Sequence, residues 1–176
     1  MICNDNDIKT AVYAGSFDPV TNGHLWIIEQ ASKIFDKVII AIGENAEKEY
    51  TFTLDERIEM LNIMTKGILN VEVTHFHNEL LVNYSKRIGA QFIVRGIRNY
   101  SDYEYEKNMR YINSDLSQDI NIIFLIPPRN FAEVSSSLVK GLIGSRGWEE
   151  IAKQYLPEIV LNKLKESIEN KKVTSR

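Results

Sequence analysis

Short runs of β-branched and apolar residues alternate along this chain with longer segments of helical periodicity, and this alternation constrains the fold most strongly. The rhythm is typical of βαβ units, in which helices connect parallel strands. Several runs are apolar at nearly every position, as strands covered on both faces require. The predicted strands are residues 9–14, 37–42, 70–76, 91–94 and 121–126. The sequence therefore predicts an α/β fold, a Rossmann-like open five-stranded parallel sheet with helices on both faces.

Helix ends are predicted from residues that cap or interrupt helices. Thr21 is a good N-cap for a helix over residues 23–35, whose apolar side chains form one stripe. Gly89 follows residues 84–88 where a helix should end, and Pro157 stands where the last helix should begin. That helix is expected to continue to about Glu169.

Two segments match the S/T-x-x-E capping box, in which two side chains satisfy the free amides of a helix start. They are Thr53 with Glu56, and Ser101 with Glu104. A helix is therefore expected to begin one residue after Thr53 and another one residue after Ser101.

The 176 residues contain no repeat and no Pro/Gly-rich linker, which predicts a single domain over residues 8–169 with an N-terminal extension (1–7) and a flexible tail (170–176). The net charge of −3 comes from interleaved acidic and basic residues, so no overall field attracts nucleic acid or anionic membrane. The single cysteine, Cys3, allows no internal disulfide and no thiol metal cluster. We find neither a secretory signal nor an apolar run of membrane-spanning length, and we expect a cytoplasmic location.

The loop after the first predicted strand reads G-S-F-D-P-V-T-N-G-H, from Gly15 to His24. In open α/β sheets, ligands bind beyond the carboxyl ends of the strands. The loop has neither the G-x-G-x-x-G fingerprint nor the G-x-x-x-x-G-K-[ST] phosphate loop, which argues against a dehydrogenase and an ordinary P-loop NTPase. With Thr21 as N-cap, His24 falls in the first helical turn, where free amides and the positive end of the helix dipole favour phosphate. Gly23 permits close approach of a ligand to the backbone.

Within the same loop, Asp18-Pro19 is expected to stiffen the turn that delivers Ser16 and Phe17. Taken alone, these residues could form only a tight turn with an exposed histidine. The whole string, however, resembles the T/S-F-D-P-x-T-x-G-H signature of a nucleotidyltransferase superfamily. From about residue 9 to residue 165, the chain is similar to one family, bacterial phosphopantetheine adenylyltransferase.

Three further segments carry this resemblance. Lys48 and the stretch T-F-T-L-D-E-R after it match the family's K-x-x-x-F-T-x-x-E-R, whose lysine binds the acceptor phosphate. The second segment, Arg95, Gly96, Ile97 and Arg98, comes directly after the fourth predicted strand, and guanidinium groups match phosphate geometry well. The resemblance implies that Arg95 meets the acceptor and that residues 96–98 face ATP together with Glu106.

The third segment, V-S-S-S-L-V-K from Val134 to Lys140, resembles the family's I-S-S-S-x-V-[KR]. Serine hydroxyls and free amides at a helix start can receive the β- and γ-phosphates, although a serine-capped helix without a ligand is common. The sequence departs from the family pattern at Ser16 (commonly threonine), Tyr50 (usually proline) and Phe131 (usually tryptophan).

His75 and His77 lie on one face if the third strand continues that far, and H-x-H near a carboxylate can bind zinc. No third ligand stands at a fixed spacing, so a polar strand end is the preferred interpretation. The resemblance instead places Glu79 and Leu81 along the pantetheine arm of the acceptor.

The resemblance implies transfer of AMP from ATP to 4′-phosphopantetheine with Mg²⁺, by a homohexamer that coenzyme A inhibits. The implied catalytic residues are His24, Lys48 and Arg95. The implied ATP-binding residues are Ser16, Phe17, His24, Gly96, Ile97, Arg98, Glu106, Phe131, Ala132, Glu133, Val134, Ser135, Ser136 and Ser137. The implied acceptor-binding residues are Ser16, Lys48, Glu79, Leu81 and Arg95. The position of the metal is unknown.

Two alternatives stay open on the sequence. One is an adenylyl- or cytidylyltransferase of the same superfamily with another phosphorylated acceptor, such as nicotinamide mononucleotide. The other is a nucleotide-binding regulator that has kept the fold and lost the chemistry.

Overall fold

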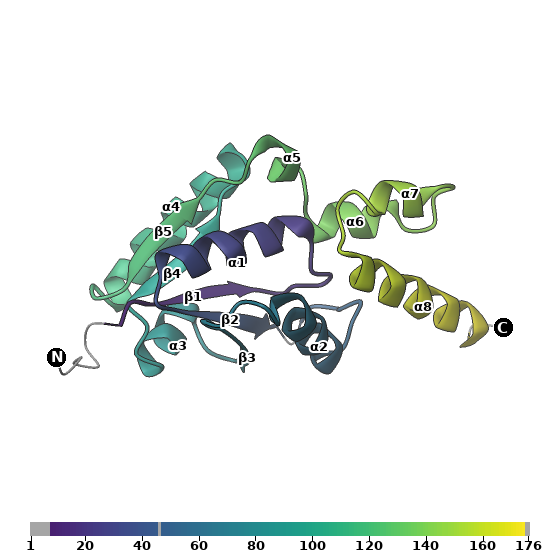
Figure 1. Cartoon of the computed structure of the whole chain (residues 1–176). Coiled ribbons are helices and arrows are strands. Elements are labelled where there is room, and N and C mark those ends of the chain that lie inside the picture. The colour runs from purple at the N-terminus through teal and green to yellow at the C-terminus, as the bar shows by residue number, and fades with distance from the viewer. Residues whose placement is uncertain (1–7, 46, 175–176) are drawn as a thin grey trace.

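The computed structural model of the chain describes residues 8–45 and 47–174 and is built around a five-stranded parallel sheet (Figure 1). The strands are β1 (Thr10–Gly15), β2 (Lys37–Glu44), β3 (Val71–His77), β4 (Phe92–Gly96) and β5 (Asn121–Leu125). Their order is β3-β2-β1-β4-β5, and every neighbouring pair is parallel. The predicted fold class is confirmed, and each strand lies within two residues of its predicted bounds.

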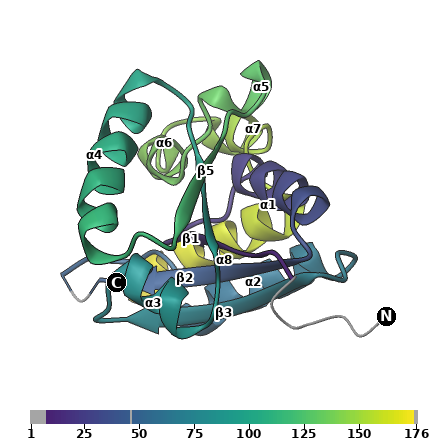
Figure 2. The same cartoon turned by 90° about the vertical axis from the view of Figure 1, so that its left-hand side faces the viewer.

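Helices cover both faces of the sheet (Figure 2). They are α1 (Asn22–Ile34), α2 (Leu54–Thr65), α3 (Leu81–Arg87), α4 (Tyr100–Leu116), α5 (Arg129–Ala132), α6 (Ser136–Leu142), α7 (Trp148–Ala152) and α8 (Glu158–Thr174). The main core joins alternate side chains of β1 and β2 to α1, α2 and α8, for example Ile40 with Ile28, Leu61 and Leu164. The side chains of opposite parity, such as Ile39, pack toward α3.

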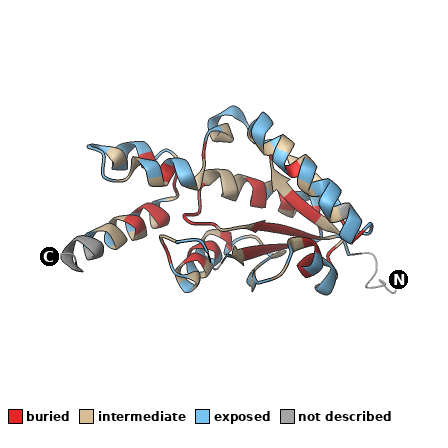
Figure 3. Ribbon diagram, turned by 180° about the vertical axis from the view of Figure 1, so that it is seen from behind, coloured by how far each residue is buried: buried red, intermediate tan, exposed pale blue. Residues whose placement is uncertain are grey.

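This alternation leaves the central strands buried on both faces, as the red strands of Figure 3 show. The order of the strands reverses between β1 and β4, which lie side by side although residues 16–91 separate them in the chain. A crevice is expected beyond the carboxyl ends of two such strands, because the connections leave them in opposite directions.

The helix caps near this crevice follow the sequence in two of three predicted cases. Thr21 caps α1 and accepts from the His24 N–H at 3.3 Å. Thr53 and Glu56 form the predicted capping box of α2.

The predicted capping box of Ser101 and Glu104 is wrong. Asn99 caps α4, and its side chain accepts from the Asp102 N–H at 2.9 Å, so the helix begins at Tyr100. Asparagine caps helices as well as serine does. The Arg98 N–H also donates to the Asp102 carboxylate at 3.0 Å, which favours the earlier start.

Three more predictions concern the ends of helices and of the chain. Gly89 has a positive φ of 72° directly after α3 and its C-cap, as expected of a glycine that ends a helix. The last helix begins at Glu158, one residue after the predicted start at Pro157, and runs to Thr174, five residues beyond the expected end. The predicted N-terminal extension, residues 1–7, lies outside the described residues.

Candidate active site

A pocket of about 400 Å³ opens beyond the carboxyl ends of β1 and β4. Its walls come from the loop after β1, the first turn of α1, the end of β4, the first turns of α4 and the segment before α6. The predicted site residues that line it are Ser16, His24, Arg95, Gly96, Arg98, Glu106, Phe131, Val134, Ser135, Ser136 and Ser137. The fold therefore brings together three segments that are far apart in the sequence, residues 13–27, 95–106 and 127–137.

His24 is held in this pocket as a neutral hydrogen-bond donor. Its Nδ1 accepts from the Thr21 N–H at 3.1 Å, so the ring proton lies on Nε2. The ring packs edge-on against Phe17, with 5.2 Å between the ring centroids. Burial, aided by the nearby Arg98 guanidinium, lowers the pKa of His24 to about 4. At neutral pH, the imidazole is uncharged and can donate only through Nε2.

Tyr13 also lines the pocket, and the sequence analysis missed it. Its ring contacts Phe17 edge-to-face, with centroids 5.5 Å apart, and lies 6.5 Å from the His24 ring. Burial raises the pKa of Tyr13, and the charges of Arg95 and Arg98 only partly oppose this. The phenol therefore stays protonated. No sequence signal marks Tyr13, because in the sequence it is one more residue of a strand whose neighbouring side chains are buried in the core.

The two pocket arginines are each paired with a carboxylate of α4. The Arg95 Nε donates to Glu106 at 2.7 Å, and its Nη1 donates to the Ala14 carbonyl at 2.9 Å. The Arg98 Nε donates to Asp102 at 2.8 Å. The guanidinium groups are thus oriented before any ligand arrives, but these four side chains add no net charge to the pocket.

Residues 134–137, which we call the serine segment, form another wall of the pocket. Ser135 caps α6, and its Oγ accepts from the Leu138 N–H at 3.0 Å. The Ser136 Oγ donates to the Pro19 carbonyl at 2.8 Å, which ties this segment to the loop that carries His24. The Arg98 Nη1 donates to the Val134 carbonyl at 3.3 Å. The loop after β1, through Pro19, and the segment after β4, through Arg98, therefore both contact the serine segment directly.

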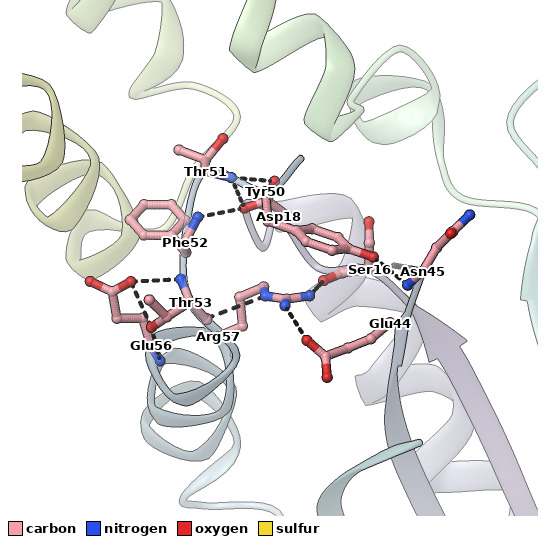
Figure 4. Close-up of polar contacts among 10 residues, drawn as sticks. All are labelled: Ser16, Asp18, Glu44, Asn45, Tyr50, Thr51, Phe52, Thr53, Glu56 and Arg57. Carbon is pink, nitrogen blue, oxygen red and sulfur yellow. Dashed lines mark hydrogen bonds and ion pairs between the residues drawn. The ribbon is translucent and has the colours of Figure 1, made fainter. Parts of the chain in front are cut away.

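Asp18 has a larger structural role than the predicted stiffening of a turn. Its buried carboxylate accepts from the N–H groups of Thr51 and Phe52 at 2.9 and 3.0 Å (Figure 4). It also accepts from the Lys140 Nζ at 3.2 Å. The carboxylate therefore joins the loop after β1 to the segment before α2 and to α6. These contacts span 33 to 122 residues of sequence, and no local pattern reveals them.

Some predicted residues do not line the pocket. Phe17 lies beneath His24 in the core, and Lys48 is exposed on the loop after β2. Leu81 lines an adjoining cavity of about 250 Å³, which shares Arg95 with the pocket. Glu79 lines neither cavity and forms an ion pair with Arg87 at 2.8 Å. Ile97, Ala132 and Glu133 also do not line the pocket.

The H-x-H pattern lies at the exposed end of β3, which runs to His77. Within residues 8–45 and 47–174, no three side chains of His, Cys, Asp or Glu are grouped to hold a metal ion. Over the same residues, no helix is both long and apolar enough to cross a bilayer.

A neutral imidazole at a helix start, two pre-oriented arginines and a serine-capped helix surround one crevice, and this arrangement is suited to binding phosphate groups. Comparison of sequences agrees, because residues 12–142 match the cytidylyltransferase-like family. The chain belongs to this family.

Individual relatives narrow the family assignment further. The chain is 59% identical over 157 residues to the phosphopantetheine adenylyltransferase of Chromobacterium violaceum, covering 89% of this chain and 96% of that protein. It is 54% identical over 159 residues to the enzyme of the same name from Neisseria meningitidis serogroup C, covering 90% and 94%. The chain is therefore a member of the phosphopantetheine adenylyltransferases.

Solved structures share the fold at lower identity. The nicotinic acid mononucleotide adenylyltransferase of Plasmodium falciparum, complexed with NaAD, superposes with a TM-score of 0.66 over 90% of this chain and 95% of that chain. The identity is 14%, so the similarity supports the fold alone.

Proposed function

We propose that the chain transfers the adenylyl group of ATP to 4′-phosphopantetheine, releasing pyrophosphate and dephospho-coenzyme A. The grouping of His24 with Ser16, Arg95, Arg98 and Ser136 in one pocket supports this proposal most directly. The names of relatives that are 54–59% identical favour this acceptor over others.

The proposed reaction is an in-line displacement. An oxygen of the acceptor phosphate attacks the α-phosphorus of ATP, the bond to the oxygen that bridges the α- and β-phosphates breaks, and pyrophosphate leaves with that oxygen. The attacking phosphate is already an anion, so no general base is needed. Catalysis then consists of positioning the groups and stabilising charge, without a covalent enzyme intermediate.

His24 is the proposed transition-state stabiliser. The capping bond to Thr21 occupies Nδ1, which leaves the Nε2–H to donate to a non-bridging oxygen of the α-phosphate. A neutral donor suits this role because it keeps its proton through the reaction.

The other side chains divide between the two substrates. We propose that Gly96, Arg98, Glu106 and residues 131–137 bind ATP. Ile97, Ala132 and Glu133, which do not line the pocket, are assigned to ATP on the family resemblance alone. Ser16, Lys48 and Arg95 hold the acceptor phosphate, and the adjoining cavity that Leu81 lines takes the pantetheine arm. Glu79 is assigned to the same arm on the family resemblance alone.

Mg²⁺ is the proposed cofactor, carried on the phosphates of ATP. The pocket carboxylates are both engaged by arginines, and the described residues offer no three-ligand cluster, so phosphate oxygens and water would supply most ligands. The ion would offset the negative charge of the β- and γ-phosphates. The pocket itself cannot do so, because its two arginines are each paired with a carboxylate. A homohexameric assembly, feedback inhibition by coenzyme A and a cytoplasmic location are proposed on the resemblance.

The function is tested by release of pyrophosphate from Mg·ATP with 4′-phosphopantetheine, unphosphorylated pantetheine or nicotinamide mononucleotide as acceptor. We expect turnover only with 4′-phosphopantetheine. Turnover with the mononucleotide alone would identify another adenylyltransferase, and no turnover with any acceptor would favour a non-catalytic regulator.

The acceptor site is tested by Lys48→Ala. We expect this variant to lose use of 4′-phosphopantetheine, because the acceptor phosphate is left without its counter-charge, while ATP affinity is retained. Lys66→Ala is the matched control, since Lys66 is an exposed lysine at the far end of α2. Unchanged acceptor kinetics in Lys48→Ala would contradict the proposed site.

A further inference from the structure

Tyr50 closes the loop that carries Lys48. We call residues 45 and 47–50, between β2 and Thr51, the Lys48 loop. The Lys48 N–H donates to the Asn45 carbonyl at 3.0 Å, and the Asn45 N–H donates to the Tyr50 hydroxyl at 2.8 Å. The phenol oxygen therefore holds the start of the loop against its end.

The ring of Tyr50 fixes the same loop to the core. The guanidinium of Arg57 lies over the ring, 4.2 Å from its centroid. Arg57 is only 1% exposed, and it donates to the Ser16 carbonyl at 3.0 Å and to the Thr53 carbonyl at 3.3 Å. Figure 4 shows the Tyr50 ring next to the Arg57 guanidinium group and the hydrogen bond from Arg57 to Ser16.

These contacts form an unbroken path from Lys48 through Asn45, Tyr50 and Arg57 to Ser16. The C-terminal end of the loop is anchored separately, because the N–H of Thr51 donates to Asp18. Lys48 is thus held through its backbone and is exposed on the surface of the protein.

We infer that Tyr50 is a positioning residue for the acceptor phosphate, holding the Lys48 loop at a fixed place relative to Ser16. The inference rests on the proposed function, in which Lys48 and Ser16 grip the same phosphate. Tyr50 acts through the backbone of the loop and through Arg57, and it touches no reacting atom. Without its hydroxyl, the loop samples more conformations, and binding the acceptor must order it.

This role predicts a selective change in kinetics. Tyr50→Phe keeps the ring over Arg57 and removes the oxygen that accepts from Asn45. The KM for 4′-phosphopantetheine should rise about 3- to 10-fold, the effect of losing one hydrogen bond. The kcat and the KM for ATP should stay within about twofold of wild type, because His24 and the serine segment are held by other contacts. Tyr50→Leu, which also loses the ring contact, should raise the acceptor KM further.

The control is Tyr111→Phe, which removes the hydroxyl of an exposed tyrosine on α4. Calorimetric titration of 4′-phosphopantetheine without ATP should show the same rise in Kd for Tyr50→Phe, and thermal unfolding should show the variant folded. An acceptor KM equal to wild type, a fall in kcat with KM unchanged, or equal rises in KM for both substrates would each overturn the positioning role.

The same experiment separates this inference from the proposed function. If wild type does not use 4′-phosphopantetheine, the proposed function fails and the inference fails with it. If wild type uses it but Lys48→Ala keeps a normal acceptor KM, the function stands, and the assignment of Lys48 to the acceptor site fails together with the inference. If Lys48→Ala loses acceptor use while Tyr50→Phe behaves as wild type, the proposed function stands and the role of Tyr50 alone is refuted.

Discussion

The two sides of the proposed phosphate site are built in different ways. His24 lies at the start of a helix that packs into the main core, and a backbone amide fixes its ring. Lys48 lies on an exposed loop, connected to the core through Tyr50 and Arg57. A donor that stabilises developing charge gains from being fixed before the reaction, whereas a group that captures an incoming substrate can be carried on the surface.

The largest expected effect tests the His24 side of the site, which we call the rigid side because the core and a backbone amide fix it. His24→Ala should lower kcat about 10²- to 10³-fold, the scale for losing one transition-state donor, with the KM for ATP little changed. Steady-state assays of pyrophosphate release measure both constants. His77→Ala, at the exposed end of β3, is the matched control and should behave as wild type. Equal losses in ATP affinity and in rate would mean that His24 serves binding rather than the transition state.

The next effect concerns the acidity of the same residue. The folded state holds the pKa of His24 at about 4, below the ordinary value of 6.5, so protonation favours the unfolded chain. The stability that the neutral imidazole contributes is therefore present above about pH 6.5 and is lost as the pH falls toward 4. At about 1.4 kcal/mol per pKa unit, this loss is at most about 3 kcal/mol.

Urea unfolding of wild type and His24→Gln at pH of about 7 and about 4.5 measures this contribution. The free energy of unfolding should fall more on acidification in wild type, because the carboxylates titrate in both proteins and only one has the histidine. Equal falls in both proteins would show that His24 is not held neutral by the fold.

Much of the rigid side could be predicted from the sequence, because its determinants are local. The cap at Thr21 needs only three residues of spacing to place His24 in the first turn of α1. The strands were found within two residues because buried parallel strands are continuous apolar runs. The start of α4 was misplaced because Asn99 and Ser101 are competing caps, and tertiary bonds of Arg98 decide between them.

The attachment of the Lys48 loop to the loop after β1 could not be predicted, because the contacts that make it are far apart in the sequence. Arg57 reaches Ser16 over 41 positions, and Asp18 reaches Thr51 over 33. The sequence analysis marked Tyr50 only as a departure from the family pattern. Its role depends on a ring in an irregular loop that lies against a guanidinium group on α2, and no helical or strand periodicity predicts such a contact.

The smallest expected effect tests Asp18, which contacts both the His24 side and the Lys48 side of the site. In Asp18→Asn, one amide oxygen replaces a carboxylate that accepts from the N–H groups of Thr51 and Phe52 and from Lys140. We expect the free energy of unfolding to fall by about 2 kcal/mol, because a buried donor is left unsatisfied and Lys140 loses its counter-ion.

Glu72→Gln is the control for this variant, since it breaks only the exposed ion pair with Lys37 and should cost less than about 1 kcal/mol. If Asp18→Asn also raises the acceptor KM with the ATP KM unchanged, the carboxylate serves the Lys48 loop more than the pocket of His24. If both KM values rise together, the two sides of the site depend on Asp18 equally. A stability loss no larger than that of Glu72→Gln would show that the Asp18 contacts do not hold the segments together.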